Sequence, residues 1–462
     1  MGGLSRFSTL LQDTKPVAKN RILIQTGNFG SKKSSLTGDE LQQARLKTQL
    51  QMDVLTYWNV AAIGLGTRDL SLGLEWWGNY LQRKPIPLVS TNLQCSSYFQ
   101  IPTYIVEPNS QIAILSLVPE NFTEQGCETK SIENSIQTAL LDAQARHSNI
   151  KRWIVMGEIT TTEQLQIGQK FPELDLYFDA KSPTPVSKVQ MQIEDWAAFS
   201  VGTRGKNVGV VYWDFDENSL LRILGQDEQA QKDLLHNQNN LTTAQKTLED
   251  LQSQDVQDAG KISRAKNRVV FYETRIAEIE KELSKEIPEK GDSIHFEMIP
   301  LSRELSDFEP IQKMVEATKT SLSLVSLEEP PNYDGIYVGS SSCQSCHTKQ
   351  YSAWSKTPHA HAYQTLKNEN RQLDFDCYSC HVTGAFDVQG PIHPKQFVGI
   401  LENVGCESCH GAARQHIANG ERTSFSKPTK EVCTKCHDGI RDEGRFDLET
   451  YMERVRHVCI GN

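Results

Sequence analysis

The sequence predicts a multidomain protein, in which a layered α/β domain with an inserted helical coiled-coil hairpin precedes a mainly α domain. Three observations predict this division. Short apolar runs alternate with amphipathic stretches over residues 1–218, and apolar side chains recur every seven residues within residues 219–290. One Cys-x-x-Cys-His motif then occurs four times within residues 331–462. A chain of 462 residues has room for two or three such domains.

Composition excludes several classes of protein. The net charge is −10, which makes nucleic acid and anionic lipid poor partners. The hydrophobic fraction of 38% is modest but sufficient for globular cores. The longest apolar runs have the length of strands, so the sequence predicts no membrane span.

The α/β domain is predicted from alternating elements. Its expected strands are Ile22–Gln25, Ala61–Gly64, Leu88–Thr91, Ile112–Leu117, Trp153–Met156, Leu174–Phe178 and Val208–Phe215. Its expected helices are Gly38–Trp58, Leu74–Gln82, Ser131–Arg146 and Thr162–Lys170. A returning strand at Ser293–Ile299 and a helix at Asp307–Lys319 would complete it. The domain would therefore comprise residues 1–218 and 291–330, and the Pro-marked stretch after residue 328 reads as a linker.

The insertion at residues 219–290 is predicted to be an antiparallel coiled-coil hairpin. Leu234, Leu241 and Leu248 form one seven-residue repeat, and a second repeat follows at Ile262, Val269, Ile276 and Leu283. The polar residues 254–260 between them would form the turn. Two interpretations stay open: a helical pair packed on the domain surface, and a protruding arm that binds a partner.

The four repeated motifs have the attachment signature of c-type haem. Two cysteines three residues apart form thioethers to the porphyrin, and the next histidine becomes the proximal iron ligand. The thioether cysteines would be Cys343, Cys346, Cys377, Cys380, Cys406, Cys409, Cys433 and Cys436, and the proximal ligands His347, His381, His410 and His437. Paired Cys-x-x-Cys units also bind zinc, but zinc does not require a histidine after every second cysteine. We therefore expect four haem c groups in residues 331–462.

Further histidines in this region are candidates for the distal iron ligands. Nine of the 12 histidines of the chain lie here, and five of them are outside the motifs: His359, His393, His416, His457 and His361. So short a segment cannot build an ordinary core around four large cofactors, so the porphyrins themselves are expected to form the core.

The cysteines and the haem indicate where the protein matures. Covalent haem is attached outside the cytoplasm, so we expect a periplasmic or extracellular protein, although no signal peptide follows Met1. A removed signal peptide, or a sequence that begins too late, would account for this. Cys95, Cys127 and Cys459 lie outside the motifs. Cys95 and Cys127 are candidates for a disulfide, and two free buried thiols are the alternative.

The C-terminal region resembles the cytochrome c-554 family of tetrahaem cytochromes. The similarity rests on Tyr337-Val-Gly-Ser, Tyr351-x-x-Trp354, Thr357-Pro-His359-Ala, Cys380-His-Val-Thr-Gly384 and Val404-Gly-Cys-Glu-Ser-Cys-His-Gly411. The resemblance implies that His359 caps the third haem, His393 the first and His416 the fourth. That family can leave its second haem without a strong distal ligand, a place that His361 or His457 could fill here.

Residues 1–218 resemble the 5′-nucleotidase branch of the calcineurin-like metallophosphoesterases. The matching segments are Gly2-Gly-Leu-Ser-Arg6, Leu23-Ile-Gln-Thr-Gly-Asn28, Gly66-Thr-Arg-Asp-Leu-Ser-Leu-Gly73, Pro87-Leu-Val-Ser-Thr-Asn92 and Gly205-Lys-Asn-Val-Gly209. That family holds two metals with Asp, Asn and His side chains. Here Asn28 stands for the bridging Asp, Thr67 and Arg68 for an Asn-His pair, and Gly157-Glu158 where a histidine belongs, while Asn92 matches. The resemblance therefore implies a fold that has lost its metal site and acts as a scaffold or partner surface.

Two functions from different classes remain. The first is electron transport by a multihaem cytochrome, with redox partner proteins as its partners; other copies of the chain or other multihaem cytochromes are further candidates. The second is a redox enzyme that acts on a small nitrogen or sulfur species, of the hydroxylamine or nitrite type, at one open haem. A weaker third reading keeps a phosphoesterase whose missing ligands come from elsewhere. We favour the electron carrier, because five candidate imidazoles for four irons leave no iron that must stay open.

Overall fold

A computed structural model describes residues 2–13, 21–31, 33–36, 38–95, 100–124, 126–182, 186–193, 196–202, 205–214, 222–224, 226–253, 259–283, 293–302, 304–324, 329–330, 332–420, 428–437 and 446–455. Within this part of the chain, two compact units are present. One combines residues 1–5, 33–55 and 308–462, and the other combines residues 6–32 and 56–307. The first grouping joins residues 33–55 to the region that carries the four motifs, a link that the sequence does not indicate.

The unit of residues 6–32 and 56–307 is built around a six-stranded sheet. Its order is β11 (Val186–Ile193), β12 (Trp196–Ser200), β10 (Leu176–Asp179), β9 (Arg152–Gly157), β6 (Ile112–Leu117) and β5 (Ile105–Glu107). The four central strands run parallel, and the two edge strands pair antiparallel to their neighbours. Because β6 is buried on both faces, its sequence is a continuous apolar run rather than an alternating one.

Each face of this sheet is covered by a different layer. Ala113, Leu115 and Leu117 of β6 pack with α4 (Ile132–Arg146) and α5 (Thr161–Lys170). Ile112 and Ile114, which alternate with them, pack in a second cluster. That cluster includes side chains from β2 (Ala62–Gly64), β3 (Leu88–Val89) and β15 (Ser293–Pro300). The layered α/β architecture predicted from the sequence is therefore present.

Three smaller sheets complete this unit. The strands β1 (Ile24–Gln25), β2 and β3 pair in parallel, and β15 lies between β13 (Asn207–Asp214) and β14 (Arg222–Leu224). The third sheet contains β4 (Leu93–Cys95), β8 (Cys127–Thr129) and β7 (Thr123–Glu124), in which Cys95 lies directly opposite Cys127. These two cysteines form a disulfide, as the sequence indicated.

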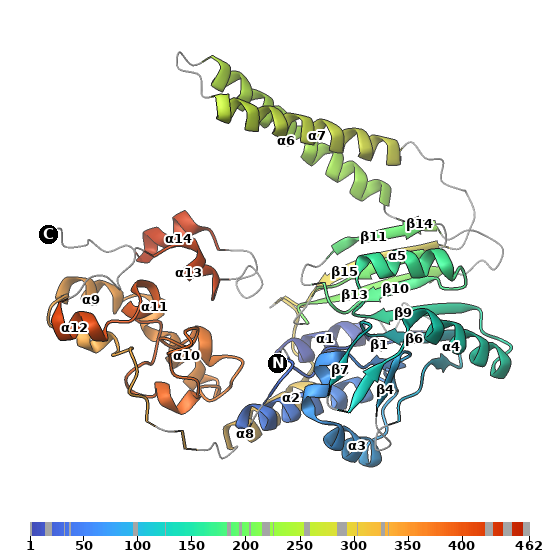
Figure 1. Cartoon of the computed structure of the whole chain (residues 1–462), viewed down its shortest axis with the longest axis horizontal. Helices are drawn as coiled ribbons and strands as arrows, with labels where there is room; N and C mark the ends of the chain where they lie inside the picture. The colour runs from blue at the N-terminus through green and yellow to red at the C-terminus, as the bar shows by residue number, and fades with distance from the viewer. Residues whose placement is uncertain are drawn as a thin grey trace. The chain divides into compact units, whose positions relative to one another are not determined.

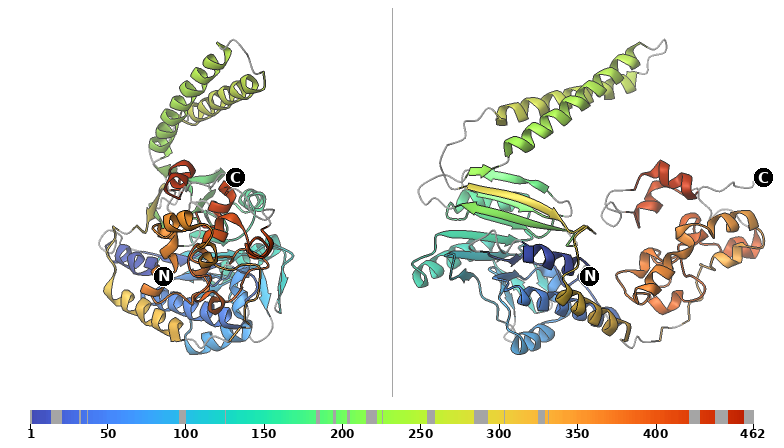
Figure 2. Two further views of the ribbon diagram at one scale, coloured as in Figure 1. Left: turned by 90° about the vertical axis from the view of Figure 1, so that its left-hand side faces the viewer. Right: turned by 180° about the vertical axis from the view of Figure 1, so that it is seen from behind.

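Two long helices occupy the inserted region. They are α6 (Gln226–Gln252) and α7 (Ala259–Leu283), which lie side by side (Figure 1 and Figure 2). Ala244 of α6 and Ile279 of α7 are buried. On their outer surface Leu235, Val270 and Phe271 are exposed.

The unit that carries the motifs is mainly helical. It contains α2 (Gly38–Tyr57) up to residue 55 and α8 (Glu309–Leu324), followed by short helices. These are η2 (Ser340–Cys343), α9 (Thr348–Trp354), η3 (Pro358–His361), α10 (Ala362–Asn368), η4 (Tyr378–Cys380), η5 (Pro394–Phe397), α11 (Cys406–His410), α12 (Arg414–Asn419), α13 (Lys430–Thr434) and α14 (Leu448–Val455). In the described part of the chain, no helix is both long and apolar enough to cross a bilayer.

Most predicted elements of the α/β domain occur within two residues of their expected bounds. The helix α8 is the main exception, since it continues to Leu324 instead of ending at Lys319. The elements not predicted from the sequence are α1 (Gly2–Asp13), β4, β5, β7, β8, β11, β12 and β14. Several of these strands have only two or three residues, which is too short for an alternating pattern.

Candidate haem-binding region

A short helical turn lies at or next to each of the four motifs. The third motif shows this best, because α11 begins at Cys406 and ends at His410. A spacing of three places Cys406 and Cys409 on the same face of the turn. The other motifs lie on or next to η2, η4 and α13. Local structure therefore presents two thiols and an imidazole at each of the four places.

Three of the four motifs are neighbours. The helix α11 contacts both η2 and α13. The Cys343 and Cys406 thiols are hydrogen-bonded to each other, which raises the pKa of Cys343 and lowers that of Cys406 to about 7. Burial, followed by the nearby Cys433, raises the pKa of Cys409 to about 11. The third motif therefore lies between the first and the fourth.

A buried glutamate inside the third motif holds this arrangement. Glu407 is 2% exposed and accepts hydrogen bonds from the backbone N–H groups of Val338, Gly339 and Ala413, at 2.8–3.2 Å. Burial raises the pKa of Glu407, and these three donors oppose that rise. The Ser340 hydroxyl adds an acceptor for the Cys406 N–H at 3.1 Å. The start of the region is thereby tied to the third motif.

Two pairs of histidine rings face each other at the spacing that a shared metal requires. The ring centroids of His347 and His416 are 6.2 Å apart, and so are those of His359 and His437. Two imidazoles bound on opposite sides of one metal, at about 2 Å per metal–nitrogen bond, have centroids roughly 6 Å apart. Both pairs join a motif histidine to one of the five extra histidines. The residues present therefore fit an iron held between two imidazoles.

This placement differs from what the family resemblance implied. The His359 ring lies beside His437 of the fourth motif, while its carbonyl oxygen accepts a hydrogen bond from the Val404 N–H, just before the third motif. His416 lies beside His347 of the first motif, where His393 was expected. Sequence resemblance gives the order of the ligands along the chain, but the partner of each ligand depends on how short helices fold over one another.

The remaining histidines lie in different surroundings. His381 Nδ1 lies 2.6 Å from the Ala362 carbonyl oxygen, so this nitrogen carries the proton and Nε2 is left to bind a metal. His393 Nε2 lies 3.2 Å from the Asp39 carboxylate, and its Nδ1 accepts a hydrogen bond from the Lys395 N–H. His361 is exposed, and His457 lies outside the described residues, as does Cys459.

The protein core of this region is small, and apolar side chains are exposed around it. The buried cluster consists of Tyr337, Tyr363, Leu366, Tyr378, Val382, Phe397 and Leu401. Five large apolar side chains between residues 386 and 400 are exposed: Phe386, Val388, Ile392, Val398 and Ile400. Val388, for example, is 99% exposed. A group of exposed apolar side chains of this kind is unfavourable in water and indicates a surface that is covered by a ligand or a partner.

Several important residues were not identified from the sequence. Nothing in the local sequence distinguishes Asp374 from a solvated loop residue, but its side chain is 2% exposed and pairs with Lys47 and Arg371. Lys47 and Gln43 of α2 contact the segment before the second motif. No local signal identifies such contacts, because the partners are far apart in the sequence. Glu407 was visible as an acidic residue within a motif, but its three backbone donors were not.

In the α/β unit, Asn28 and Thr67, which the resemblance placed at metal-ligand positions, both donate to Glu158. The Asn28 amide donates to Glu158 at 2.7 Å, and the Thr67 N–H donates to the same carboxylate at 2.6 Å. Asp69 is fully buried and accepts from the backbone of Asn28, Gly30 and Gly66. Burial raises the pKa of Asp69 to about 6, although these hydrogen bonds favour the ionised form and oppose the rise.

Asn92, the one matching metal-ligand position, is also used internally. Its amide nitrogen donates to the Val118 carbonyl oxygen at 2.9 Å, and its amide oxygen accepts from the Val118 N–H at 2.9 Å. The side chain is 1% exposed. These contacts connect the end of β3 to the end of β6.

Comparison with known proteins supports the resemblance of the C-terminal region to cytochrome c-554. Residues 342–411 match the family described as Cytochrome c554 and c-prime. Cytochrome c-554 from Nitrosomonas europaea is 33% identical over 127 residues, which cover 23% of this chain and 54% of that protein. The chain therefore spans about half the length of this curated relative.

Solved structures that resemble the chain include nucleotidases and calcineurin-like phosphoesterases. A 5′-nucleotidase precursor from Thermus thermophilus has a TM-score of 0.39 at 16% identity and covers 47% of this chain and 46% of its own. The sulfate thiohydrolase SoxB from Thermus thermophilus has a TM-score of 0.46 at 9% identity, with coverages of 76% and 54%. The calcineurin-like phosphoesterase YfkN from Bacillus subtilis has a TM-score of 0.43 at 11% identity, with coverages of 69% and 89%.

Proposed function

We propose that residues 331–462 bind four haem c groups and transfer electrons between redox partner proteins. Eight cysteines in four motifs would attach the porphyrins, and the motif histidines would be the proximal ligands. Each haem supplies one-electron chemistry at its iron. The chain supplies attachment, the axial imidazoles and the close placement of the motifs.

The two facing histidine pairs are the observation that carries this proposal. We assign His416 as the distal ligand of the first haem and His359 as that of the fourth. His393, His361 and His457 remain for the second and third haems. Iron with two imidazole ligands has no open position for a substrate, and this favours electron transfer over turnover.

The small size of the protein core supports the proposal that the cofactors form part of the core of this region. Four porphyrins would cover the apolar side chains between residues 386 and 400 and supply the buried area that the short chain lacks. The contact of α11 with η2 and α13 would bring the first, third and fourth haems close together. Electrons could then pass from one haem to the next within a single chain.

The α/β domain is proposed to be a scaffold without a metal site. The Asn28 amide and the Thr67 backbone N–H both donate to Glu158, the Asn28 amide oxygen accepts from the Arg68 N–H, and Asn92 is hydrogen-bonded to backbone groups. The side-chain oxygens of Asn28, Asn92 and Glu158 therefore already have partners. We expect no hydrolysis of AMP or of a general phosphate ester with added Mn²⁺. Hydrolysis that is abolished by Asn92→Ala would overturn this part of the proposal.

Export from the cytoplasm follows from the same chemistry. Covalent haem attachment and the Cys95–Cys127 disulfide both fit an oxidising compartment, so we propose a periplasmic or extracellular location. Redox proteins, including other multihaem cytochromes or further copies of this chain, are the proposed partners.

A redox enzyme with an open second haem is the alternative. Among the residues that the structure describes, no second histidine ring faces His381 as His416 faces His347. If the second iron has no distal imidazole, a small nitrogen or sulfur species could bind there. The spin state of the second haem is therefore the property to measure.

The haem count and the spin states decide between these proposals. A pyridine haemochrome assay against protein mass is expected to give four haems per chain. Low-temperature electron paramagnetic resonance of the oxidised protein is expected to show low-spin ferric haems. Two haems per chain, or zinc in their place, would refute the cytochrome proposal, and a high-spin signal would favour the enzyme.

A further inference from the structure

One face of α2 contacts the region that carries the haem motifs. Asp39, Gln43 and Lys47 are spaced by four residues, which places them in a row on one side of the helix. Each of them bonds to a residue between 373 and 393. All these residues belong to the same compact unit, although α2 is predicted from the sequence as a helix of the α/β domain.

Lys47 is the centre of a buried ionic cluster. Its ammonium group lies 2.5 Å from Asp374 Oδ1 and 2.7 Å from Asp376 Oδ2, and its side chain is only 12% exposed. Arg371 contacts the other oxygen of Asp374 at 2.5 Å. Burial disfavours ionised Asp374, but Lys47 and Arg371 outweigh it and lower the pKa of this carboxyl group. Removing one partner of a buried pair leaves a charge uncompensated.

Gln43 binds the same segment through its backbone. Its Nε2 donates to the Leu373 carbonyl oxygen at 2.9 Å, and its Oε1 accepts from the Phe375 N–H at 3.2 Å. Gln43 is 1% exposed, so both hydrogen bonds are shielded from water. The Gln43 amide therefore bonds to the backbone of residues 373 and 375, as the backbone of a neighbouring strand would do.

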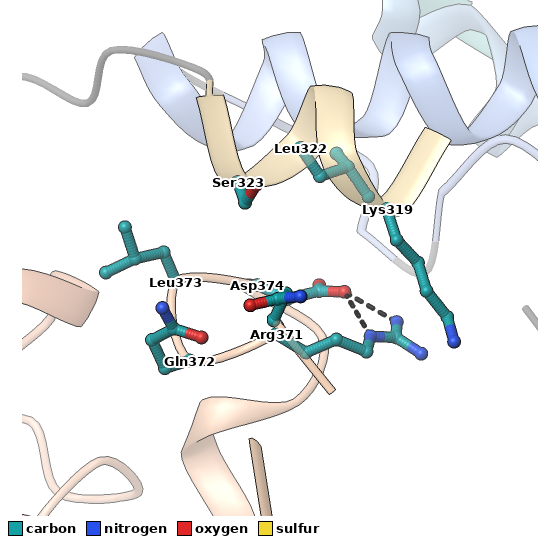
Figure 3. Close-up of a pocket in the computed structure, with 8 residues that line it drawn as sticks. Lys319, Leu322, Ser323, Arg371, Gln372, Leu373 and Asp374 are labelled. Atoms are coloured by element: carbon teal, nitrogen blue, oxygen red, sulfur yellow. Dashed lines mark hydrogen bonds and ion pairs between the residues drawn. The ribbon is translucent and has the colours of Figure 1, made fainter. Parts of the chain in front are cut away.

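The helix α8 contacts this segment as well. Lys319 bonds to Glu369 at 3.2 Å and to Glu316 of its own helix at 3.0 Å. Figure 3 shows Arg371 and Asp374 facing each other, with Lys319, Leu322 and Ser323 of α8 above them. Residues 369–376 are thus held by both α2 and α8.

The segment of residues 369–376 leads directly into the second haem motif, so its contacts with α2 and α8 bear on that motif. Asp376 directly precedes Cys377, the first cysteine of the second motif. On the same helix face, Asp39 contacts His393, whose ring also lies 5.7 Å from that of Phe375. Whatever fixes residues 369–376 therefore also fixes the start of the second haem attachment site.

We propose that α2 fixes the segment that leads into the second motif, and that Lys47 is a positioning residue for the second haem. This inference rests on the proposed binding of haem by residues 331–462. It gives α2 a specific task, which is to fix the orientation and surroundings of one haem out of four. Lys47 acts through its ion pair with Asp374.

The test uses the full haem-loaded chain and compares three variants. Lys47→Met removes the charge and keeps the length of the side chain, whereas Lys47→Arg keeps the charge. Lys33→Met is the matched control, because Lys33 pairs with Glu40 at 2.7 Å on the exposed surface, where its side chain is 62% exposed. Each variant is titrated potentiometrically with detection of the individual haem signals, and is then digested with a limiting amount of protease.

Lys47→Met is expected to shift the signal and potential of one haem and leave three unchanged. Cleavage within residues 369–376 is expected to become roughly tenfold faster, the effect of losing one charged hydrogen bond. Lys47→Arg and Lys33→Met should resemble the unchanged protein. If Lys47→Met resembles Lys33→Met in both measurements, or shifts all four haems alike, the inference is wrong.

A second variant covers the case in which Lys47→Met does not fold. Gln43→Leu removes both backbone hydrogen bonds at nearly constant volume and leaves every charge in place. It is expected to shift the same single haem, and an unchanged spectrum would overturn the proposal. If the protein without any substitution binds fewer than four haems, the proposed function itself is refuted. Failure of this inference and failure of the proposed function can therefore be told apart.

Discussion

His347 and His416 face each other with ring centroids 6.2 Å apart, and they are contributed by the first motif and by α12. His359 and His437 repeat this relationship at the same distance. The motif histidines could be identified from the sequence alone, because their signature is local. Which distal histidine serves which motif is a property of the tertiary structure.

The first prediction concerns His416. Replacing it with Ala should remove the distal ligand of one haem, so one of four low-spin ferric signals should be replaced by a high-spin signal. Electron paramagnetic resonance of the oxidised variant measures this. His295→Ala is the control, since His295 is exposed on β15 in the unit that lacks the motifs, and it should leave the spectrum unchanged. If His416→Ala retains every low-spin signal, the assignment of His416 is wrong.

The second prediction concerns the disulfide between β4 and β8. Replacing both Cys95 and Cys127 with Ser should lower the free energy of unfolding of the α/β domain by about 3–4 kcal/mol, because the bond closes a loop between positions 32 apart in the sequence. Calorimetry measures the change. Thiol labelling of the denatured, unreduced protein is the independent check, and labelling of both cysteines would contradict the bond.

The third prediction concerns Asp69. Its pKa is raised from about 4 in the unfolded chain to about 6 in the folded protein, so the folded state favours the protonated form. This contribution to stability is fully present below about pH 4 and is lost as the pH rises through about 6. The change amounts to roughly 3 kcal/mol, from about 1.4 kcal/mol per pKa unit.

Hydrogen exchange can measure this effect locally. Backbone amides of Gly30 and Gly66, which donate to Asp69, should exchange faster at pH 7 than at pH 4.5 after correction for the intrinsic rate. Asp69→Asn does not titrate and should lose this difference. Equal protection of these amides at both pH values in the unchanged protein would contradict the raised pKa.

How far the sequence predicted the structure can be seen from particular residues. Ile112–Leu117 was located without error, because a continuous apolar run is typical of a strand buried on both faces. Lys47 and Asp374 could not be paired, because each has an ordinary local context and 327 positions separate them. Glu158 was recorded only as a residue in place of a histidine, although its carboxylate bonds to Asn28 and Thr67. Elements that depend on local periodicity and spacing can therefore be predicted from the sequence, whereas polar contacts between distant residues cannot.

The last prediction concerns turnover at the second haem. A working site would need acid-base groups close to an open iron, so that protons arrive with electrons. Four titratable side chains lie near the second motif: Asp374, Asp376, Tyr378 and Asp387. Asp374 and Asp376 are paired with Lys47, and the pKa of Asp374 is lowered, so it does not hold a proton near neutral pH.

The two other groups are also engaged in structural contacts. The Tyr378 hydroxyl donates to the Ile392 carbonyl oxygen at 3.0 Å, and burial raises its pKa to about 12. Asp387 accepts a hydrogen bond from the Tyr337 hydroxyl at 3.0 Å. We therefore expect reversible reduction and reoxidation by small carriers, without consumption of hydroxylamine or nitrite. Steady turnover of either compound, together with a high-spin ferric signal that shifts when it is added, would replace the electron carrier with the enzyme.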